Sequence, residues 1–331
     1  MVATELGLPF FGRKQLRCRI RYQIRFNCIR VVQCKYRRHP MDEPIPVCAF
    51  LISSDAQVAA INLSDTDQQN DPKVGYRWLH FDLNDPKFEP WALRTLPQTA
   101  AMALTQSETR PRCDLLDSGL IMNLRGVNLN PGANPDDMVS LRLWVRDGLI
   151  ISARARRVWA VEDIRQRVEV GKGPPSIASF LAELTYSLTK RIEKVSLELV
   201  ENTDEFEERS FAMSRGLSAE LASARQSAIK LRRFVRPQAE AIIELSEGHA
   251  WPLDTKSAGI LREAANHALR TIEELDATVD RLRAVHDHLE LQQSSALGRN
   301  SYVLSIVAAI FLPLGFLTGL FGVNIGGMPG I

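Results

Sequence analysis

The sequence YVLSIVAAIFLPLGFLTGLF, at residues 302–321, contains no Asp, Glu, Lys, Arg or His. As a helix rising about 1.5 Å per residue it would be roughly 30 Å long, which matches the hydrocarbon core of a bilayer. A surface helix of a soluble protein keeps one polar face, and this stretch has none. We therefore predict a transmembrane helix. Arg299 just before it places the preceding part of the chain on the cytoplasmic side.

Small residues recur at steps of three and four along the predicted span, so they share one helical face. An anchor that acts alone needs no such face, whereas helices that pack closely around a common axis do. Gly315 and Gly319 form a small-x-x-x-small pair, and Pro313 removes a backbone donor and predicts a helix kink. The predicted pore-lining residues are Ser301, Leu304, Ser305, Ala308, Leu312, Gly315 and Gly319.

Upstream of the span, apolar residues alternate at steps of four and three, the heptad pattern of helices packed side by side. The pattern fits either a bundle of several chains or an antiparallel hairpin within one chain. His286 fills its one polar slot and is a candidate metal ligand, although such a histidine more often sets the register. No proline intervenes, so one helix is expected from about Leu261 to Phe321. The seam residues are Leu261, Ala265, Ala268, Ile272, Leu275, Val279, Leu282 and Leu289.

Residues 176–246 predict two long polar helices with a break near residues 215–218. Pro237 would kink the second helix or mark its restart. The first helix carries an acidic cluster, which is usually just a solvated face. The alternative is that the cluster concentrates divalent cations on the cytoplasmic side. Its members are Glu201, Asp204, Glu205, Glu207 and Glu208.

Before residue 171, short β-favouring runs mix with short helices, which is the pattern of an α/β domain. The sequence GKGPPS at residues 171–176 is the predicted boundary of this domain. Short helices are expected at residues 91–106, interrupted by Pro97. Strand character is predicted at residues 47–52, 56–63, 76–83, 120–129, 138–154 and 156–161.

The first forty residues form a basic extension, with 10 Lys or Arg and no acidic residue between Gly12 and Pro40. They are either an arm that touches anionic lipid or upstream sequence read in frame, and we favour the second interpretation, with translation starting at Met41. The net charge of the whole chain is only +2, so no global field predicts nucleic-acid binding. The 5 cysteines include no C-x-x-C pair and are expected to be reduced thiols in the cytosol.

These patterns together predict an α+β fold in which a cytoplasmic α/β domain is followed by a long helical stalk that continues into a membrane helix. The predicted segments are a basic extension at 1–40, the α/β domain at 41–170, a cytoplasmic long-helix region at 171–250, the stalk helix at 251–301, the transmembrane helix at 302–321 and an extracytoplasmic glycine-rich loop at 322–331.

The end of the chain carries a family resemblance. AIFLPLGFLTGLFGVNIGGMP at residues 309–329 resembles the first membrane helix and signature loop of the CorA-type divalent-cation transporters. Gly322, Val323 and Asn324 match the family's Gly-Met-Asn tripeptide with valine in the middle. The following sequence Ile325-Gly326-Gly327 is similar to the zinc-transporting ZntB branch rather than to magnesium-type members. Residues 124–145 and 231–238 also look like that branch, and the similarity spans roughly residues 46–330.

This resemblance implies a homopentamer in the bacterial inner membrane, with cytoplasmic domains that form a funnel. Five copies of the first membrane helix would line a pore for a divalent cation, foremost Zn²⁺, which is a transported substrate and not a cofactor. Asn324 would form a ring at the outer mouth, where a neutral amide can hold a hydrated ion without binding it too tightly. The family also has a second membrane helix, so we expect that residue 331 marks a truncation. The implied selectivity loop comprises Gly322, Val323, Asn324, Gly326 and Gly327.

Two alternatives stay open. One is a channel for Mg²⁺, Co²⁺ or Ni²⁺ on the same scaffold, because the loop offers amide and carbonyl oxygen whereas zinc usually prefers nitrogen and sulfur. The other is a membrane-anchored oligomeric scaffold that transports nothing. The residues do not reveal the direction of transport or any coupling to protons. The sequence contains no phosphate loop, no G-x-S-x-G and no metallohydrolase spacing, so no enzyme activity is expected.

Overall fold

The computed structural model describes residues 43–55, 57–63, 75–107, 109–116, 118–211, 216–320 and Gly322. The predicted basic extension at residues 1–40 lies outside the described residues. So do Val323, Asn324, Gly326 and Gly327 of the predicted selectivity loop.

Within the described residues, a 7-stranded mixed sheet has the order β2-β1-β3-β7-β6-β5-β4. β3 and β7 pair in parallel, with Trp78 opposite Ile150, and the other neighbours pair antiparallel. A parallel pair requires a long crossover connection, which α1, α2 and the strands β4 to β6 supply. The strands are β1 Cys48–Ile52, β2 Val58–Ala60, β3 Tyr76–Asp82, β4 Arg112–Leu116, β5 Gly119–Gly126, β6 Val139–Arg146 and β7 Leu149–Arg154.

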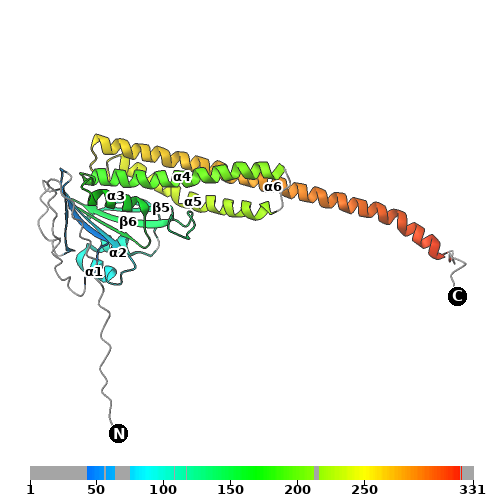
Figure 1. Cartoon of the computed structure of the whole chain (residues 1–331), viewed down its shortest axis with the longest axis horizontal. Helices are drawn as coiled ribbons and strands as arrows, with labels where there is room; N and C mark the ends of the chain where they lie inside the picture. Colours follow the sequence, from blue (N-terminus) through cyan, green and yellow to red (C-terminus); the bar gives the residue numbers. More distant parts are fainter. Residues whose placement is uncertain are drawn as a thin grey trace, which may run out of the picture. The chain divides into compact units, whose positions relative to one another are not determined.

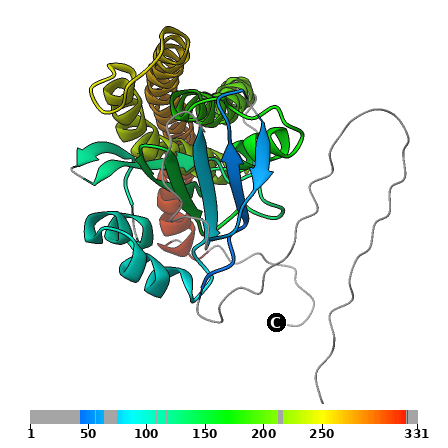
Figure 2. The ribbon, with the colours of Figure 1, turned by 90° about the vertical axis from the view of Figure 1, so that its left-hand side faces the viewer.

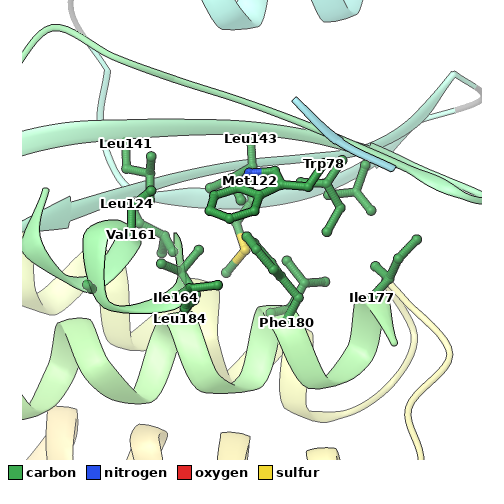
Figure 3. Packing of buried hydrophobic residues seen from close by; sticks show 14 of the residues in the cluster. Trp78, Met122, Leu124, Leu141, Leu143, Val161, Ile164, Ile177, Phe180 and Leu184 are labelled. Atoms are coloured by element: carbon green, nitrogen blue, oxygen red, sulfur yellow. The ribbon is translucent and has the colours of Figure 1, made fainter. Parts of the chain in front are cut away.

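Helices cover both faces of this sheet because its central strands are apolar on both sides. α1 (Phe88–Thr95) and α2 (Gln98–Thr105) lie on one face, and α3 (Trp159–Glu169) and α4 (Ile177–Phe211) lie on the other (Figure 2). Along β3, Trp78 points into the α3–α4 layer, while Leu79 and Phe81 point into the α1–α2 layer. The Trp78 ring packs edge-on against Phe180 of α4 at a centroid distance of 4.9 Å (Figure 3).

Two local assignments from the sequence need correction. Residues 156–161 are not a strand, because α3 begins at Trp159 and buries Val161, Ile164 and Val168 at helical spacing. A six-residue run is too short for its period to separate helix from strand. The edge strand β4 was not predicted; its side chains are exposed or half-buried, so it lacks the apolar alternation of a core strand.

A bundle of long helices follows the sheet. α4, α5 (Leu217–Ser246) and α6 (Thr255–Leu320) pack along one another (Figure 1), and α4 and α5 are separated near residues 215–218, as predicted. Pro237 lies inside α5 and does not end it. The predicted heptad seam of α6 is buried against α4 and α5 of the same chain. At its last turns Val285 is buried, whereas the His286 side chain is 43% exposed.

α6 is one helix of 66 residues that passes through Pro313, as the sequence predicts. Its start is fixed by Asp254, whose Oδ1 accepts a hydrogen bond from the Ser257 backbone N–H at 2.6 Å. That bond is an N-cap, and it holds the pKa of Asp254 below its ordinary value. In Figure 1, α6 continues beyond the far ends of α4 and α5. The same helix therefore belongs both to the packed bundle and to the apolar segment.

Candidate functional site

The apolar segment of α6 is not covered by any other described part of the chain. Every residue from 301 to 320 is exposed, including Leu304 at 74% and Leu312 at 73%. Among the described residues, α6 is the one helix long and apolar enough to cross a membrane. Leaving so much apolar surface in water is unfavourable, by about 25 cal/mol per Å². Lipid or other protein surface must therefore cover it.

The predicted pore-lining residues do lie on one face of this helix. Each residue turns the helix by about 100°, so the positions from Ser301 to Gly319 fall within an arc of roughly 100°. A Cβ atom added at Gly315 or Gly319 would meet nothing within 4 Å. The face is thus shallow and open in the single chain. The opposite face is formed by Val303, Ile306, Ile310, Leu314 and Leu317.

Two hydroxyl groups in this segment bond to their own helix. Ser305 Oγ donates to the Ser301 carbonyl at 2.9 Å, and Thr318 Oγ1 donates to the Gly315 carbonyl at 3.1 Å. These bonds satisfy the hydroxyl hydrogens without a partner outside the helix, while the oxygens keep free lone pairs. Pro313 has no backbone N–H, so the carbonyl four residues earlier loses its usual hydrogen bond within the helix. Gly322 follows the helix in a left-handed conformation with φ +50°.

Much of the acidic cluster predicted to attract cations is already paired with arginines. Arg281 of α6 binds Asp204 and, at 2.7 Å, Glu207. This contact lowers the pKa of Glu207 and raises the pKa of Arg281. Arg209 binds Glu205 at 3.4 Å. Glu201 and Glu208 are exposed and form no ion pair with another described residue. Asp204 and Glu207 therefore tie α4 to α6, whereas Glu205 pairs within α4.

The described residues contain no group of three or more His, Cys, Asp or Glu placed to hold a metal ion. His286 Nε2 lies 3.2 Å from Glu290 Oε1, one helical turn further along α6. The neighbouring His288 instead contacts Gln292 at 2.7 Å. As expected for residues two apart on a helix, the two imidazoles do not share a ligand. As a candidate metal ligand, His286 therefore has one carboxylate beside it, and the described residues supply no third ligand there.

A charged cluster that the sequence did not reveal lies between α4 and α6. His267 Nδ1 is 2.9 Å from Glu193 Oε1, and His267 Nε2 is 3.0 Å from Glu263 Oε1. Lys190 Nζ also binds Glu193, at 2.9 Å. Burial alone would raise the pKa of Glu193, but the hydrogen bonds from Lys190 and His267 hold it below the ordinary value. Glu263 and His267 are four residues apart on one helix, a spacing that can be recognised in the sequence. Glu193 comes from another helix and reaches His267 only through the packing of α4 against α6.

A profile of the CorA-like Mg²⁺ transporter protein family matches residues 73–331. The chain belongs to this family. It is a family of membrane transporters for divalent cations and not a class of enzymes, as the resemblance at residues 309–329 indicated.

Individual CorA-like proteins agree with this assignment. The zinc transport protein ZntB of Pectobacterium carotovorum subsp. carotovorum (strain PC1) is 35% identical over 256 residues, which are 76% of this chain and 78% of that protein. The divalent cation transporter CmaX of Pseudomonas aeruginosa (strain PAO1) is 34% identical over 260 residues, again 76% and 78% of the two chains.

Solved structures confirm the predicted fold. The structure of full-length CmaX has a TM-score of 0.77 to this chain at 30% identity, covering 88% of this chain and 91% of that one. The ZntB cytoplasmic domain from Vibrio parahaemolyticus RIMD 2210633 has a TM-score of 0.66 at 25% identity, covering 76% and 99%. The mixed-sheet domain, the long helices and the apolar extension of α6 therefore form a CorA-like architecture.

Proposed function

We propose that this protein carries divalent cations, foremost Zn²⁺, through a pore lined by the membrane segments of five α6 helices. One observation carries the proposal: α6 runs unbroken from a packed bundle into an uncovered apolar segment with a face of small residues. Family membership and the similarity to ZntB proteins support the same conclusion.

Small side chains would let the helices approach closely on the stripe that contains Ala308, Gly315 and Gly319. The stripe contributes hydroxyl oxygens and backbone carbonyls but no charge. Such a surface suits a cation that keeps much of its water shell, because no fixed carboxylate binds it too tightly to leave. Val303, Ile310 and Leu317 on the opposite face would then meet lipid or another membrane helix.

The selectivity loop would follow at the outer end of α6. Asn324 is proposed to form a ring of amide oxygens there, and Gly322, Gly326 and Gly327 would let the backbone turn and present carbonyls. Arg299 at the other end supports a cytoplasmic bundle and sheet domain by the positive-inside tendency, hence a location in the bacterial inner membrane. In this division, residues 41–170 form the α/β domain, 171–250 the long-helix region, and 251–301 the stalk.

Transport of Mg²⁺, Co²⁺ or Ni²⁺ is the second candidate. The matching family profile is described by Mg²⁺ transport, and the described residues hold no nitrogen and sulfur cluster that would favour zinc. A non-transporting scaffold is less well supported, because the heptad seam is filled by α4 and α5 of the same chain.

Reconstitution in liposomes tests the proposal. Uptake of Zn²⁺, Mg²⁺, Co²⁺ and Ni²⁺ would be followed for the wild-type protein, for Asn324→Ala, and for Asn266→Ala as a matched control on the exposed surface of the bundle. We expect saturable Zn²⁺ flux that falls at least tenfold in Asn324→Ala and is retained in the control. Absence of flux for all four ions in the wild type would favour the scaffold. Flux of Mg²⁺, Co²⁺ or Ni²⁺ without flux of Zn²⁺ would favour the second candidate function.

A further inference from the structure

The imidazole of His267 joins α4 to α6 and can gain or lose a proton. Its side chain is only 12% exposed and lies between two carboxylates: Glu193 Oε1 of α4 is 2.9 Å from Nδ1, and Glu263 Oε1 of α6 is 3.0 Å from Nε2. An ionised carboxylate only accepts hydrogen bonds, and a neutral imidazole has a single N–H. Both contacts are therefore hydrogen bonds at the same time only when the ring carries two hydrogens and a positive charge.

Loss of that proton to water weakens the link. Whichever nitrogen keeps its hydrogen, the other turns a lone pair towards a carboxylate, and the remaining bond loses the help of the positive charge. Hydrogen bonds assisted by charge are roughly twice as strong as neutral ones. Lys190 Nζ, 3.4 Å from Nδ1, can donate to a bare Nδ1, but this contact is longer than the one to Glu193. The protonated ring thus holds the two helices together more strongly.

The remaining groups that face His267 leave this link intact. Lys190 opposes a positive charge on the ring, but it lies closer to Glu193, at 2.9 Å. Tyr186 of α4 packs edge-on against the imidazole at a centroid distance of 6.2 Å. Among the described residues, α3 and α5 form no hydrogen bond or ion pair with His267. Their charged groups nearest to α4 and α6 are paired: Asp163 with Arg191, Arg167 with Glu183, and both Arg232 and Arg236 with Asp276.

The same contact recurs two heptads further along both helices with a side chain that keeps its charge. Arg281 of α6 binds Glu207 of α4 through Nε and Nη2, each at 2.7 Å. Both the Glu193–His267 pair and the Glu207–Arg281 pair join residues 74 positions apart, so they occupy equivalent places in the contact between the two parallel helices. Arginine is not deprotonated in proteins. This contact therefore has one permanent ion pair and one that depends on a proton.

We propose that His267 is a proton-sensitive clamp, which holds α6 against α4 more firmly when its ring is protonated. Arg281 keeps the helices in register at every pH. His267 makes the attachment of the first part of α6 respond near neutral pH, where histidine side chains change charge. Because α6 continues without a break into the apolar segment, the clamp couples the attachment of that helix to the proton concentration around the bundle.

Thermal unfolding at two pH values tests the clamp. Melting temperatures of the detergent-solubilised protein would be measured at pH 5.5 and 8.5 for the wild type, His267→Gln, Glu193→Gln and the double variant. We expect His267→Gln to lower the melting temperature by several degrees at pH 5.5 and by less than half as much at pH 8.5. In the Glu193→Gln background the loss at pH 5.5 should be smaller, because the two residues act through one contact.

Two further variants separate the clamp from other effects of pH. His249→Gln is the matched control, since His249 lies outside the helices, is 78% exposed and has Glu247 at 3.5 Å. It should leave both melting temperatures unchanged. His267→Arg carries a permanent charge, as Arg281 does two heptads later. Relative to the wild type, it should be more stable at pH 8.5 than at pH 5.5, so it tests the same contact without removing it.

Three results would overturn the proposal. His267→Gln could lower the melting temperature equally at both pH values, which would make the residue merely structural. The effects of His267→Gln and Glu193→Gln could simply add at pH 5.5, or His249→Gln could alter the pH dependence as much as His267→Gln does. Each of these results is independent of ion flux in liposomes, so the clamp and the proposed transport function stand or fall separately.

Discussion

Replacing Gly315 by phenylalanine distinguishes a helix whose small-residue face packs against other helices from one whose face meets lipid. In the single chain a Cβ atom at Gly315 meets nothing within 4 Å. Glycine is also a poor helix former, by about 1 kcal/mol relative to alanine. An isolated membrane helix should therefore tolerate this substitution or gain from it. Against a neighbouring helix, the added ring would cost about 1–3 kcal/mol by overpacking. This cost lowers the association constant of each helix contact by a factor of roughly 5 to 150.

The assay combines Zn²⁺ flux in liposomes with the mass of the detergent-solubilised assembly. Leu314→Phe is the matched control, because it places the same ring at the same depth but about 100° around the helix. We expect Gly315→Phe to lose the assembly or to reduce flux at least tenfold, and Leu314→Phe to retain both. If Gly315→Phe assembles and transports like the wild type, the face of small residues is not a helix contact and the reasoning is wrong.

Three further predictions concern the sheet domain and the helical bundle. Leu275→Ala empties a fully buried position (0% exposed) in the bundle and should lower the free energy of unfolding by about 2–5 kcal/mol, whereas Leu269→Ala on the exposed face should change the urea midpoint little. Arg281→Gln removes the partner of Glu207. The depressed pKa of Glu207 adds stability at neutral pH, and this stability is lost on acidification below the ordinary carboxyl value of 4.5. The melting temperature of the variant should therefore depend less on pH in that range than that of the wild type, and an unchanged pH profile would count against the pair. Burial lowers the pKa of His80 from 6.5 to about 3, so on acidification the unfolded chain takes up this proton first. The free energy of unfolding therefore falls between these pH values, by at most about 1.4 kcal/mol per pH unit. In His80→Gln, the urea midpoint should change less between pH 7 and 5 than in the wild type.

The long elements could be predicted from the sequence because their patterns extend over many turns. The course of α6 from Thr255 to Leu320 follows from a heptad repeat, an uncharged stretch and the absence of a break between them. The central strands β3, β5 and β6 were recognisable from runs of large apolar side chains. In each case a local pattern and the global fold specify the same structure.

Other features depend on contacts that a linear pattern does not contain. The two possible partners of the heptad seam could be told apart only once α4 and α5 were seen to fill it. Near the end of the bundle α6 packs against both helices, and Val285 is buried there instead of His286, the residue that the heptad pattern places in the seam. Glu193 meets His267 only through helix packing.

Site-directed spin labelling along residues 303–319 tests the central claim most directly. Each position in turn would carry a nitroxide in the reconstituted protein, and collisions with oxygen, which partitions into lipid, would be compared with collisions with a water-soluble nickel chelate. We expect chelate contact to peak at Ser305, Ala308 and Leu312 with a period of about 3.6 residues, while oxygen contact peaks at Ile310 and Leu314. The reverse pattern, or uniform contact with oxygen around the helix, would contradict a pore lined by this face of α6.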